Sequence, residues 1–268
     1  MMKNLMNKLP SQVKAIIALL QEASEASSAR IFLVGGCVRD LLLRKKNLDI
    51  DICLEADVVR FLEFLRKKQR LLKVAYYKKF FTATVIFDGG LKIDIARSRV
   101  EKYPHPGSLP VVSPGSILDD LRRRDFTINA MAISLNPDDY GYLIDIFGGL
   151  KDLRDKTIRF LHDLSFIDDP TRILRAARLQ QRLGFKIDAR TLQGINDALK
   201  LEMFSRISGY RISRELRLCL NEKDPLRQIE NLQRLSILKT ALPVREQLQL
   251  LEEKWPGMRK SRNKFIKK

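Results

Sequence analysis

Residues that build disulfide frameworks and zinc sites are scarce in this sequence. Its three cysteines, Cys37, Cys53 and Cys219, lie far apart and form no CxxC pair, so neither a disulfide framework nor a dithiol motif is expected. Two histidines, His105 and His162, are too few to suggest a zinc centre. We therefore expect a reducing, cytoplasmic setting.

Long apolar runs are also missing. No stretch approaches the roughly 18 consecutive apolar residues that indicate a membrane span. The first residues include Lys3 and Lys8 but lack the apolar core and small-residue cleavage site of a secretory signal. We therefore expect no membrane partner.

Acidic residues are outnumbered, because 32 Asp and Glu stand against 50 Lys and Arg and leave a net charge of +18. A positive excess of this size favours a polyanionic partner, and nucleic acid is the first candidate. The alternative is a basic surface without a specific partner.

The hydrophobic pattern predicts a mixed first part and a helical second part. The expected helices of the first part are 11–29, 38–44 and 58–70, and its expected strands are 31–34, 49–54, 82–87 and 91–96. The turn Asp88-Gly89-Gly90 predicts a hairpin between the last two strands. Residues 103–116, rich in proline and glycine, are expected to form a mobile loop.

From Asp168 onward the pattern is helical. Asp168 or Asp169 is an expected N-cap, with Pro170 at the first helical position, and Gly184 is the expected end of that helix. Further helices are expected at 190–201, 208–222, 225–237 and 244–254.

Two aspartates offer the first hint of chemistry. Asp49 and Asp51 alternate with Ile50 on an expected strand, so the period of two places both carboxylates on one face. Neighbouring carboxylates repel, and Mg²⁺, which takes one or two carboxylates together with substrate phosphates, relieves that repulsion. Asp94 on another strand could join them, and three carboxylates can bind two metal ions. Taken alone, such a pattern is more often a solvated strand face.

A glycine pair offers a place for phosphate. Gly35 and Gly36 follow an expected strand and open a helix, where backbone N–H groups face an anion. Arg39 lies in the first turn of that helix and can reach the same anion. Because the pair belongs to neither a P-loop nor a GxGxxG motif, the alternative is a tight turn with no ligand.

Five segments, in order, resemble the motifs of the class II tRNA nucleotidyltransferases. This family contains CCA-adding enzymes, their CC-adding and A-adding relatives, and bacterial poly(A) polymerases. The segments are 33–40 with 49–51, 123–130, 145–153 with 158–159, 168–178, and 206–216.

The resemblance implies an α+β fold. A polymerase-beta-like nucleotidyltransferase head with a small mixed sheet is expected over residues 1–140, and an all-helical neck and shortened body over 141–268. The implied activity is template-independent addition of nucleotides from CTP and ATP to the tRNA 3′ end. An RNA 3′-hydroxyl would attack the α-phosphate in line with release of pyrophosphate, with Mg²⁺ as the cofactor.

The resemblance also assigns roles to single residues. Asp49, Asp51 and Asp94 resemble the catalytic carboxylates and metal ligands. The expected contacts to the triphosphate are Gly35, Gly36, Arg39 and Arg124. Asp169 and Arg172 resemble the pair that recognises the incoming base, and Arg175 and Arg178 resemble further nucleotide contacts.

The spacing of the last group fits a recognition surface. Asp169, Arg172, Arg175 and Arg178 are three residues apart, which predicts one helix face. Because Arg donates and Asp accepts, the pair can mimic a base partner and select C or A without a template. The alternative is a basic solvated face.

The sequence departs from the family pattern at two motif positions and in length. Asp168 stands where the family usually has Glu, and Tyr210 stands where an acid is common. The chain is also shorter than typical members, so a reduced body and tail are expected.

The C-terminal segment is basic. From Lys254 to Lys268 it has seven cations and no acid, with Trp255 and Phe265 interleaved. This pattern predicts contacts with an RNA backbone and a stacked base, or else a disordered basic tail. The expected RNA contacts are Lys260, Arg262 and Lys264.

Alternative functions stay open. The chain could build or repair the tRNA CCA end, or be an A-only or CC-only enzyme or a poly(A) polymerase acting on another RNA 3′ end. A non-catalytic RNA-binding relative is the alternative of another class, and the intact Asp49, Asp51 and Asp94 argue against it.

Overall fold

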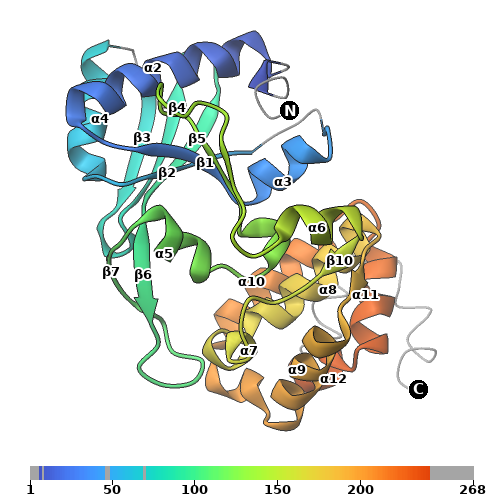
Figure 1. Cartoon of the computed structure of the whole chain (residues 1–268). Coiled ribbons are helices and arrows are strands. Elements are labelled where there is room, and N and C mark those ends of the chain that lie inside the picture. Colours follow the sequence, from blue (N-terminus) through green and yellow to red (C-terminus); the bar gives the residue numbers. More distant parts are fainter. Residues whose placement is uncertain (1–5, 8, 46–48, 69–70, 242–268) are drawn as a thin grey trace. The chain divides into compact units, whose positions relative to one another are not determined.

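The computed structural model describes residues 6–7, 9–45, 49–68 and 71–241 (Figure 1). These residues form two compact units. The first contains residues up to Pro104 together with Leu109–Asp163, and the second contains His105–Ser108 together with the residues from Leu164 onward. Within the described ranges, no helix combines the length and apolarity that a bilayer crossing requires.

The division between the units differs from the boundary expected after residue 140. Strand β9 (Leu143–Ile144) pairs with β8 (Ala132–Ser134), and α6 (Gly149–Arg154) packs against the 3-10 turn η2 (Thr127–Asn129). These contacts keep the residues between 141 and 163 in the first unit.

A mixed sheet forms the centre of the first unit. Among the described residues its seven strands are ordered β3-β4-β5-β2-β1-β8-β9, and only β2 and β5 are parallel neighbours. The strands not yet given are β1 (Ile31–Val34), β2 (Ile50–Leu54), β3 (Leu71–Tyr77), β4 (Thr82–Phe87) and β5 (Lys92–Arg97). The expected α+β class with a small mixed sheet is confirmed.

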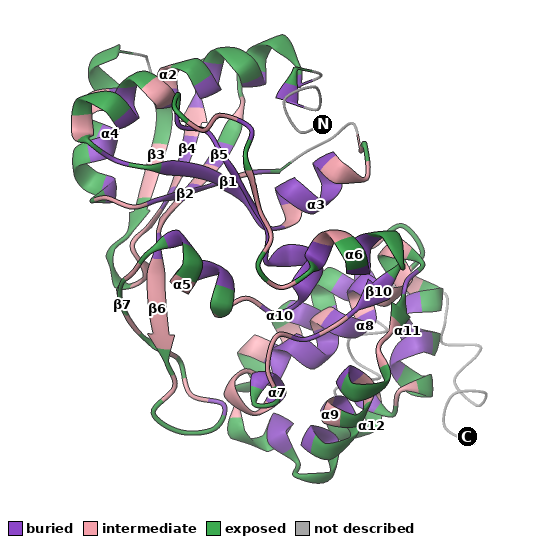
Figure 2. Ribbon diagram, in the orientation of Figure 1, coloured by how far each residue is buried: buried purple, intermediate pink, exposed green. Residues whose placement is uncertain are grey.

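Helices α2 (Ser11–Ser27) and α4 (Val58–Lys68) cover one face of this sheet (Figure 1). Both bury apolar residues at helical spacing, such as Ile16 and Leu20 of α2. The strands meet them with alternate residues, and Val85 of β4 and Ile95 of β5 lie in the same buried cluster. Figure 2 colours the buried residues of these strands and helices purple. The core therefore lies between this face and the two helices.

The opposite face of the sheet is only partly covered. Phe32 and Cys53 pack there against Leu121 of α5 (Ile117–Arg122). Helix α5 begins with a capping box, in which Ser116 Oγ accepts from the Asp119 N–H and the Asp119 carboxylate accepts from the Ser116 N–H. The rest of this face has polar residues, which form the candidate site.

Two predictions about turns have different outcomes. The hairpin at Gly89 and Gly90 is confirmed, since β4 and β5 pair antiparallel on either side of it and both glycines have positive φ (93° and 82°), which glycine adopts without strain. The loop expected over 103–116 is wrong in part, because β7 (Val111–Pro114) pairs with β6 (Arg99–Lys102). The β-branched Val111 and Val112 favour that strand despite the prolines.

The second unit is helical. Its elements are α7 (Ser165–Asp168), α8 (Thr171–Leu183), β11 (Lys186–Ile187), α9 (Ala189–Lys200), η3 (Met203–Arg206), α10 (Gly209–Leu220), α11 (Pro225–Arg234) and α12 (Ile237–Ala241). Helices α8, α10 and α11 pack against one another. Helix α8 ends at Gly184 with φ +66°, as predicted. The helix expected over 244–254 lies outside the described residues.

The first unit contains three further short elements. They are α3 (Gly36–Leu42), η1 (Lys78–Phe80) and β10 (Thr157–Ile158).

Candidate active site

Asp51 and Asp94 lie side by side on the partly covered face of the sheet. Strands β2 and β5 are parallel, and their register pairs Asp51 with Asp94. Paired residues on neighbouring strands project to the same face, so both carboxylates lie on one face of the sheet. On the other side of β5, Thr84 of β4 is in register with Asp94, and its hydroxyl donates to Asp94 Oδ1 over 2.5 Å. The expectation that Asp94 lies beside Asp51 is confirmed.

Asp49 is exposed and directly precedes β2. No three His, Cys, Asp or Glu side chains of the described residues converge as a metal site. The structure therefore brings together two of the three predicted carboxylates. Such a pair still suits Mg²⁺, because this ion commonly takes one or two protein carboxylates and completes its shell with water and substrate phosphate.

The electrostatic environment of Asp51 favours a cation. Burial raises the pKa of the Asp51 carboxyl to about 6; Arg124 opposes this shift, and the carboxylates of Asp94 and Asp49 add to it. No donor among the described residues forms a hydrogen bond with the Asp51 carboxylate. A half-buried carboxylate without donors, next to like charges, is stabilised by a divalent ion. The residues of this site therefore fit a metal.

Lys92 already approaches this acidic group. Its ammonium donates to Asp94 Oδ2 over 2.7 Å, and that hydrogen bond is the main cause that raises the pKa of Lys92. Together with the Thr84 hydroxyl, Lys92 engages both oxygens of Asp94. The Lys92 ammonium would therefore have to leave Oδ2 if Asp94 bound a metal ion through that oxygen.

The turn at Gly35 brings a guanidinium next to these carboxylates. Gly35 has φ +69°, in the region that favours glycine. A Cβ atom placed on Gly35 would lie 2.5 Å from Arg124 Nη1 and 3.9 Å from Asp51 Oδ2. The missing side chain thus allows Arg124 to lie over the turn beside Asp51. The structure therefore brings three predicted site residues together, while their contact with a triphosphate stays a prediction.

Arg39 and Gly36 have internal contacts. Arg39 is buried; its Nε and Nη2 each donate to Asp40 over 2.9 Å, and its Nη1 donates to Asn129 Oδ1 over 2.7 Å. Asn129 in turn donates to Asp125 over 3.0 Å. A Cβ on Gly36 would lie 3.4 Å from Arg39 Nη2. The chain of hydrogen bonds fixes the segment that follows Arg124, and the phosphate contacts of Gly36 and Arg39 stay predictions.

Asp120 is a site residue that the sequence analysis missed. Its fully buried carboxylate accepts from Arg124 Nη2 over 2.8 Å and from Arg123 Nε over 2.9 Å. Burial acts to raise the pKa of Asp120, but the Arg124 and Arg123 guanidinium groups lower it below its ordinary value. Asp120 precedes the two arginines by three and four residues, the spacing of helical ion pairs, so a signal was present in the sequence.

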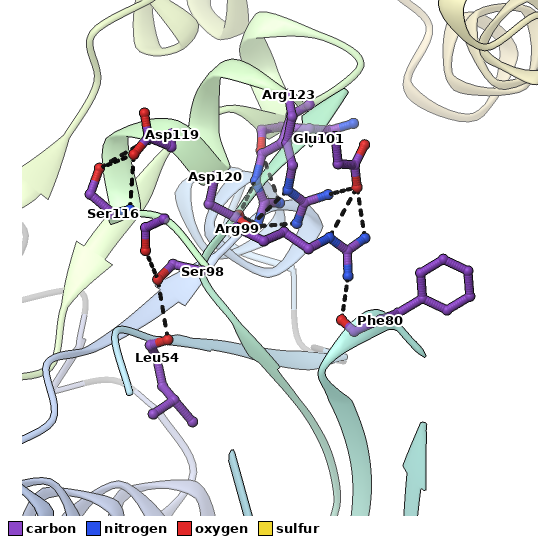
Figure 3. A network of polar contacts seen from close by, with 12 residues as sticks. Leu54, Phe80, Ser98, Arg99, Glu101, Ser116, Asp119, Asp120 and Arg123 are labelled. Carbon is purple, nitrogen blue, oxygen red and sulfur yellow. Dashed lines mark hydrogen bonds and ion pairs between the residues drawn. The ribbon is translucent and has the colours of Figure 1, made fainter. Parts of the chain in front are cut away.

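The network extends from Asp120 to the neighbouring strand β6 (Figure 3). Arg123 Nη1 donates to Glu101 Oε1 over 2.9 Å, and Arg99 donates to the same oxygen over 2.8 Å. Arg99 also donates to the Phe80 carbonyl over 2.7 Å. This network anchors the end of α5, and with it the arginine that faces Gly35.

In the second unit, Asp169 lies two residues before the start of α8, and hydrogen bonds to one of its carboxylate oxygens orient it. Its Oδ1 accepts from the Thr171 N–H over 3.1 Å, from the Thr171 hydroxyl over 2.6 Å and from Arg211 Nη2 over 2.8 Å. Among the described residues no donor forms a hydrogen bond with Oδ2. The carboxylate is therefore held in one orientation with an acceptor oxygen available.

The three predicted arginines of α8 differ in their environment. Arg172 is buried, and its Nη1 donates to Ser165 Oγ over 2.8 Å. Arg175 and Arg178 each lie 3.9 Å from Glu215 of α10. The expected single helix face is wrong in part, because Asp169 precedes the helix, whereas Arg172, Arg175 and Arg178 lie on it at the expected spacing. Nucleotide contacts of these arginines stay predictions.

The predicted RNA contacts of the basic C-terminal segment, Lys260, Arg262 and Lys264, lie outside the described residues.

Comparison with known proteins identifies the family of this fold. Residues 31–159 match the model of the poly A polymerase head domain. An A-adding tRNA nucleotidyltransferase of Geobacter sulfurreducens is 42% identical over 241 residues, which cover 90% of this chain and 27% of that protein. A CC-adding tRNA nucleotidyltransferase of Deinococcus radiodurans is 40% identical over 193 residues, covering 72% of this chain and 50% of that protein.

A solved structure agrees with both. The Thermotoga maritima CCA-adding enzyme complexed with tRNA is 41% identical, with a TM-score of 0.76, and the match covers 89% of this chain and 54% of that chain. This chain thus spans from about a quarter to about half of the length of the relatives it matches. It belongs to the tRNA nucleotidyltransferase and poly(A) polymerase family, and its first unit contains the head domain of that family.

Proposed function

We propose that the chain adds nucleotides from CTP and ATP to the 3′ end of tRNA, with release of pyrophosphate. The observation that supports this most directly is the register of Asp51 with Asp94, next to Gly35 and Arg124. The two carboxylates can hold a divalent ion, and the Arg124 guanidinium over the Gly35 turn can face the phosphates of a nucleoside triphosphate. The likeness to A-adding, CC-adding and CCA-adding proteins supports tRNA as the acceptor.

In the proposed reaction the RNA 3′-hydroxyl attacks the α-phosphorus, the bond to the β-phosphate oxygen breaks, and pyrophosphate leaves. Asp51 and Asp94, with Asp49 beside them, would hold Mg²⁺, which when bound lowers the pKa of the attacking hydroxyl and neutralises the leaving group. Arg124 neutralises charge on the triphosphate from its position over Gly35. Asp120 keeps this guanidinium in place through two hydrogen bonds.

Base selection is proposed for the second unit. Cytosine and adenine both present an exocyclic amino group, whereas uracil and guanine present a carbonyl oxygen at the corresponding position. Asp169 Oδ2 accepts a hydrogen bond from such an amino group and repels a carbonyl. Arg172 donates to the acceptor nitrogen of the same base edge. This division assigns the chemistry to the first unit and the choice of nucleotide to Asp169 and Arg172.

An addition assay tests the proposal. Purified chain is offered tRNA that ends before the CCA sequence, after its first C or after its second C, together with an unrelated RNA. CTP and ATP are supplied singly and together, with Mg²⁺. We expect C and then A to be added to tRNA alone.

Other outcomes of the assay distinguish the alternatives. Addition of A only to tRNA ending in CC indicates an A-adding enzyme, and addition of C only indicates a CC-adding one. Long A tails on any RNA indicate a poly(A) polymerase. Binding of RNA without any incorporation contradicts the proposed function and favours a non-catalytic relative.

The proposed location is the cytoplasm. All three cysteines are buried and free, which suits a reducing compartment. Fractionation of the native cell, with the chain detected by antibody, tests this location.

A further inference from the structure

Arg211 of α10 joins two segments that are distant in the sequence. Its Nη2 donates to Asp169 Oδ1 over 2.8 Å, and its Nη1 donates to the Gly107 carbonyl over 2.6 Å. The side chain is 19% exposed, so both hydrogen bonds are largely protected from water. One planar guanidinium therefore fixes the position of the Gly107 backbone relative to the Asp169 carboxylate.

Gly107 has a position that other residues cannot adopt without strain. Its φ is +73°, and a Cβ atom there would lie 2.9 Å from Arg206 Cβ and 3.0 Å from the Arg206 carbonyl oxygen. The Gly107 N–H also donates to the Ile167 carbonyl over 3.0 Å. Residues 105–108 thus belong to the helical unit, although the strands on either side, β6 and β7, belong to the first unit.

The donors on Asp169 are not equivalent. Both Thr171 donors come from two residues away, so they fix Asp169 only relative to the start of α8. Arg211 is the donor that comes from another helix and that also binds the loop. Removing Arg211 leaves the carboxylate free to rotate about the Thr171 contacts, and Oδ1 and Oδ2 then exchange places more readily.

We propose that Arg211 is a positioning residue for nucleotide selection: it orients Asp169 Oδ2 toward the amino group of the incoming base and couples that orientation to the loop at Gly107. The inference rests on the proposed function for the base-reading role of Asp169. The ligand of Oδ2 is a nucleobase with an exocyclic amino group, because an ionised carboxylate only accepts hydrogen bonds. Arg211 itself does not touch the nucleotide.

Selectivity is the first readout. kcat and KM are measured for ATP against GTP, and for CTP against UTP, with the wild type, R211Q, R211K and R217Q. Arg217 is an exposed arginine on the same helix and serves as the control for lost charge. We expect R211Q to lower the ratio of kcat/KM between correct and incorrect nucleotide about tenfold, equal to about 1.4 kcal/mol, mainly through KM.

The conservative variant and the control complete this measurement. R211K keeps a cation near Asp169 and regains part of the selectivity, while R217Q matches the wild type. Unchanged selectivity in R211Q, with kcat and KM lowered alike for all four nucleotides, overturns the proposal in favour of a structural role.

A double-mutant cycle isolates the pathway through Asp169. If Arg211 acts by orienting this carboxylate, R211Q lowers selectivity in the wild-type background and has no further effect on selectivity in D169N. An equal loss in both backgrounds contradicts the assignment. G107A, which forces the loop away from Arg206, should reproduce the selectivity loss of R211Q.

Hydrogen exchange tests the coupling without relying on activity. We expect the amides of residues 105–109 to exchange faster in R211Q than in the wild type or R217Q, because the Gly107 N–H is then less protected. Unchanged exchange overturns the coupling to the loop. If the wild-type chain adds no nucleotide, the proposed function fails, whereas the exchange rates still decide whether Arg211 holds Gly107.

Discussion

Asp51 of the first unit and Asp169 of the second unit are held in opposite ways. Asp51 is half-buried, accepts no hydrogen bond from the described residues, and has a pKa raised to about 6, chiefly by desolvation. Asp169 accepts three hydrogen bonds on one oxygen, two from Thr171 and one from Arg211. The Asp51 carboxylate thus has no hydrogen-bond donor among the described residues, whereas Asp169 has three donors on Oδ1 and none on Oδ2.

The difference indicates what each carboxylate is for. A partly desolvated carboxylate without hydrogen-bond donors is less stable as an anion until a cation binds it, so the environment of Asp51 favours a divalent metal. A carboxylate that recognises a base must present one oxygen in a fixed direction, and donors on Oδ1 provide this for Asp169. The lack of hydrogen-bond donors at Asp51 thus indicates a metal ligand. The three donors on one oxygen of Asp169 indicate a group that recognises a base.

The largest expected effect comes from removing a carboxylate of the sheet. D51N and D94N should each lower the rate of nucleotide addition at least about a thousandfold, because the charge stabilisation that a metal supplies amounts to several kcal/mol and each 1.36 kcal/mol is a factor of ten. Single-turnover incorporation with tRNA and ATP or CTP measures this.

The matched control is D169N, which removes a charge of the same size in the other unit. It should retain a measurable rate and lose discrimination between ATP and GTP. If D169N lost as much rate as D51N, the separate roles assigned to the two carboxylates would be wrong.

Asp120 is a third case, a carboxylate whose charge is neutralised by two guanidinium groups. D120N leaves Arg123 and Arg124 without their buried partner, and removing one partner of a buried ion pair costs about 3–5 kcal/mol. Urea unfolding at neutral pH measures this loss, with D138N as a control, since Asp138 is exposed.

The same variant should change the response to acid. The pKa of Asp120 in the folded protein lies below its value in the unfolded chain, about 3.9. Its contribution to the free energy of unfolding is therefore present above about pH 4 and is lost as the pH falls through the folded pKa. Stability measured between pH 6 and about pH 2 should fall less steeply in D120N than in the wild type. Parallel curves contradict this account.

A smaller effect is expected at Lys92, the cation next to the metal ligands. K92M should raise the affinity for Mn²⁺ about tenfold, near 1.4 kcal/mol, because the ammonium no longer competes for Asp94. The control is K73M, since Lys73 is exposed and lies in the same cross-strand row, in register with Ile86, which pairs with Lys92. Calorimetric titration with Mn²⁺ measures both. An equal gain in K73M attributes the effect to net charge alone.

The smallest effect is expected at Thr171. T171V removes one of the three donors to Asp169 Oδ1 and leaves its own N–H and Arg211 in place. Loss of this one hydrogen bond, about 1 kcal/mol, should lower selectivity for ATP over GTP about fivefold. T240V, which removes an exposed hydroxyl of α12, should leave selectivity unchanged. A larger loss in T171V than in R211Q would reverse the ranking of the donors.

Local patterns predicted several elements of both units. The alternation of charged and apolar residues predicted the strand that contains Asp51. The glycines after Asp88 predicted the hairpin between β4 and β5. Gly184 marked the end of α8, because the left-handed conformation there favours glycine. These features depend on residues that are neighbours in the sequence.

Features that depend on distant residues were not predictable in the same way. The parallel register of Asp51 with Asp94 joins strands separated by α4, β3 and β4, so no local pattern specifies it. The edge strand β3 lacks clean alternation of buried and exposed residues and was missed. The contact of Gly107 with Arg211 spans 104 positions, and only the fold reveals it.

Binding of Mn²⁺, followed by electron paramagnetic resonance, tests whether Asp51 and Asp94 are the metal ligands. The wild type, D51N, D94N and D169N are titrated in the presence of a non-hydrolysable ATP analogue. The account predicts that bound Mn²⁺ is lost in D51N and D94N and retained in D169N. Equal Mn²⁺ binding in all four proteins would contradict the assignment of Asp51 and Asp94 as the metal ligands.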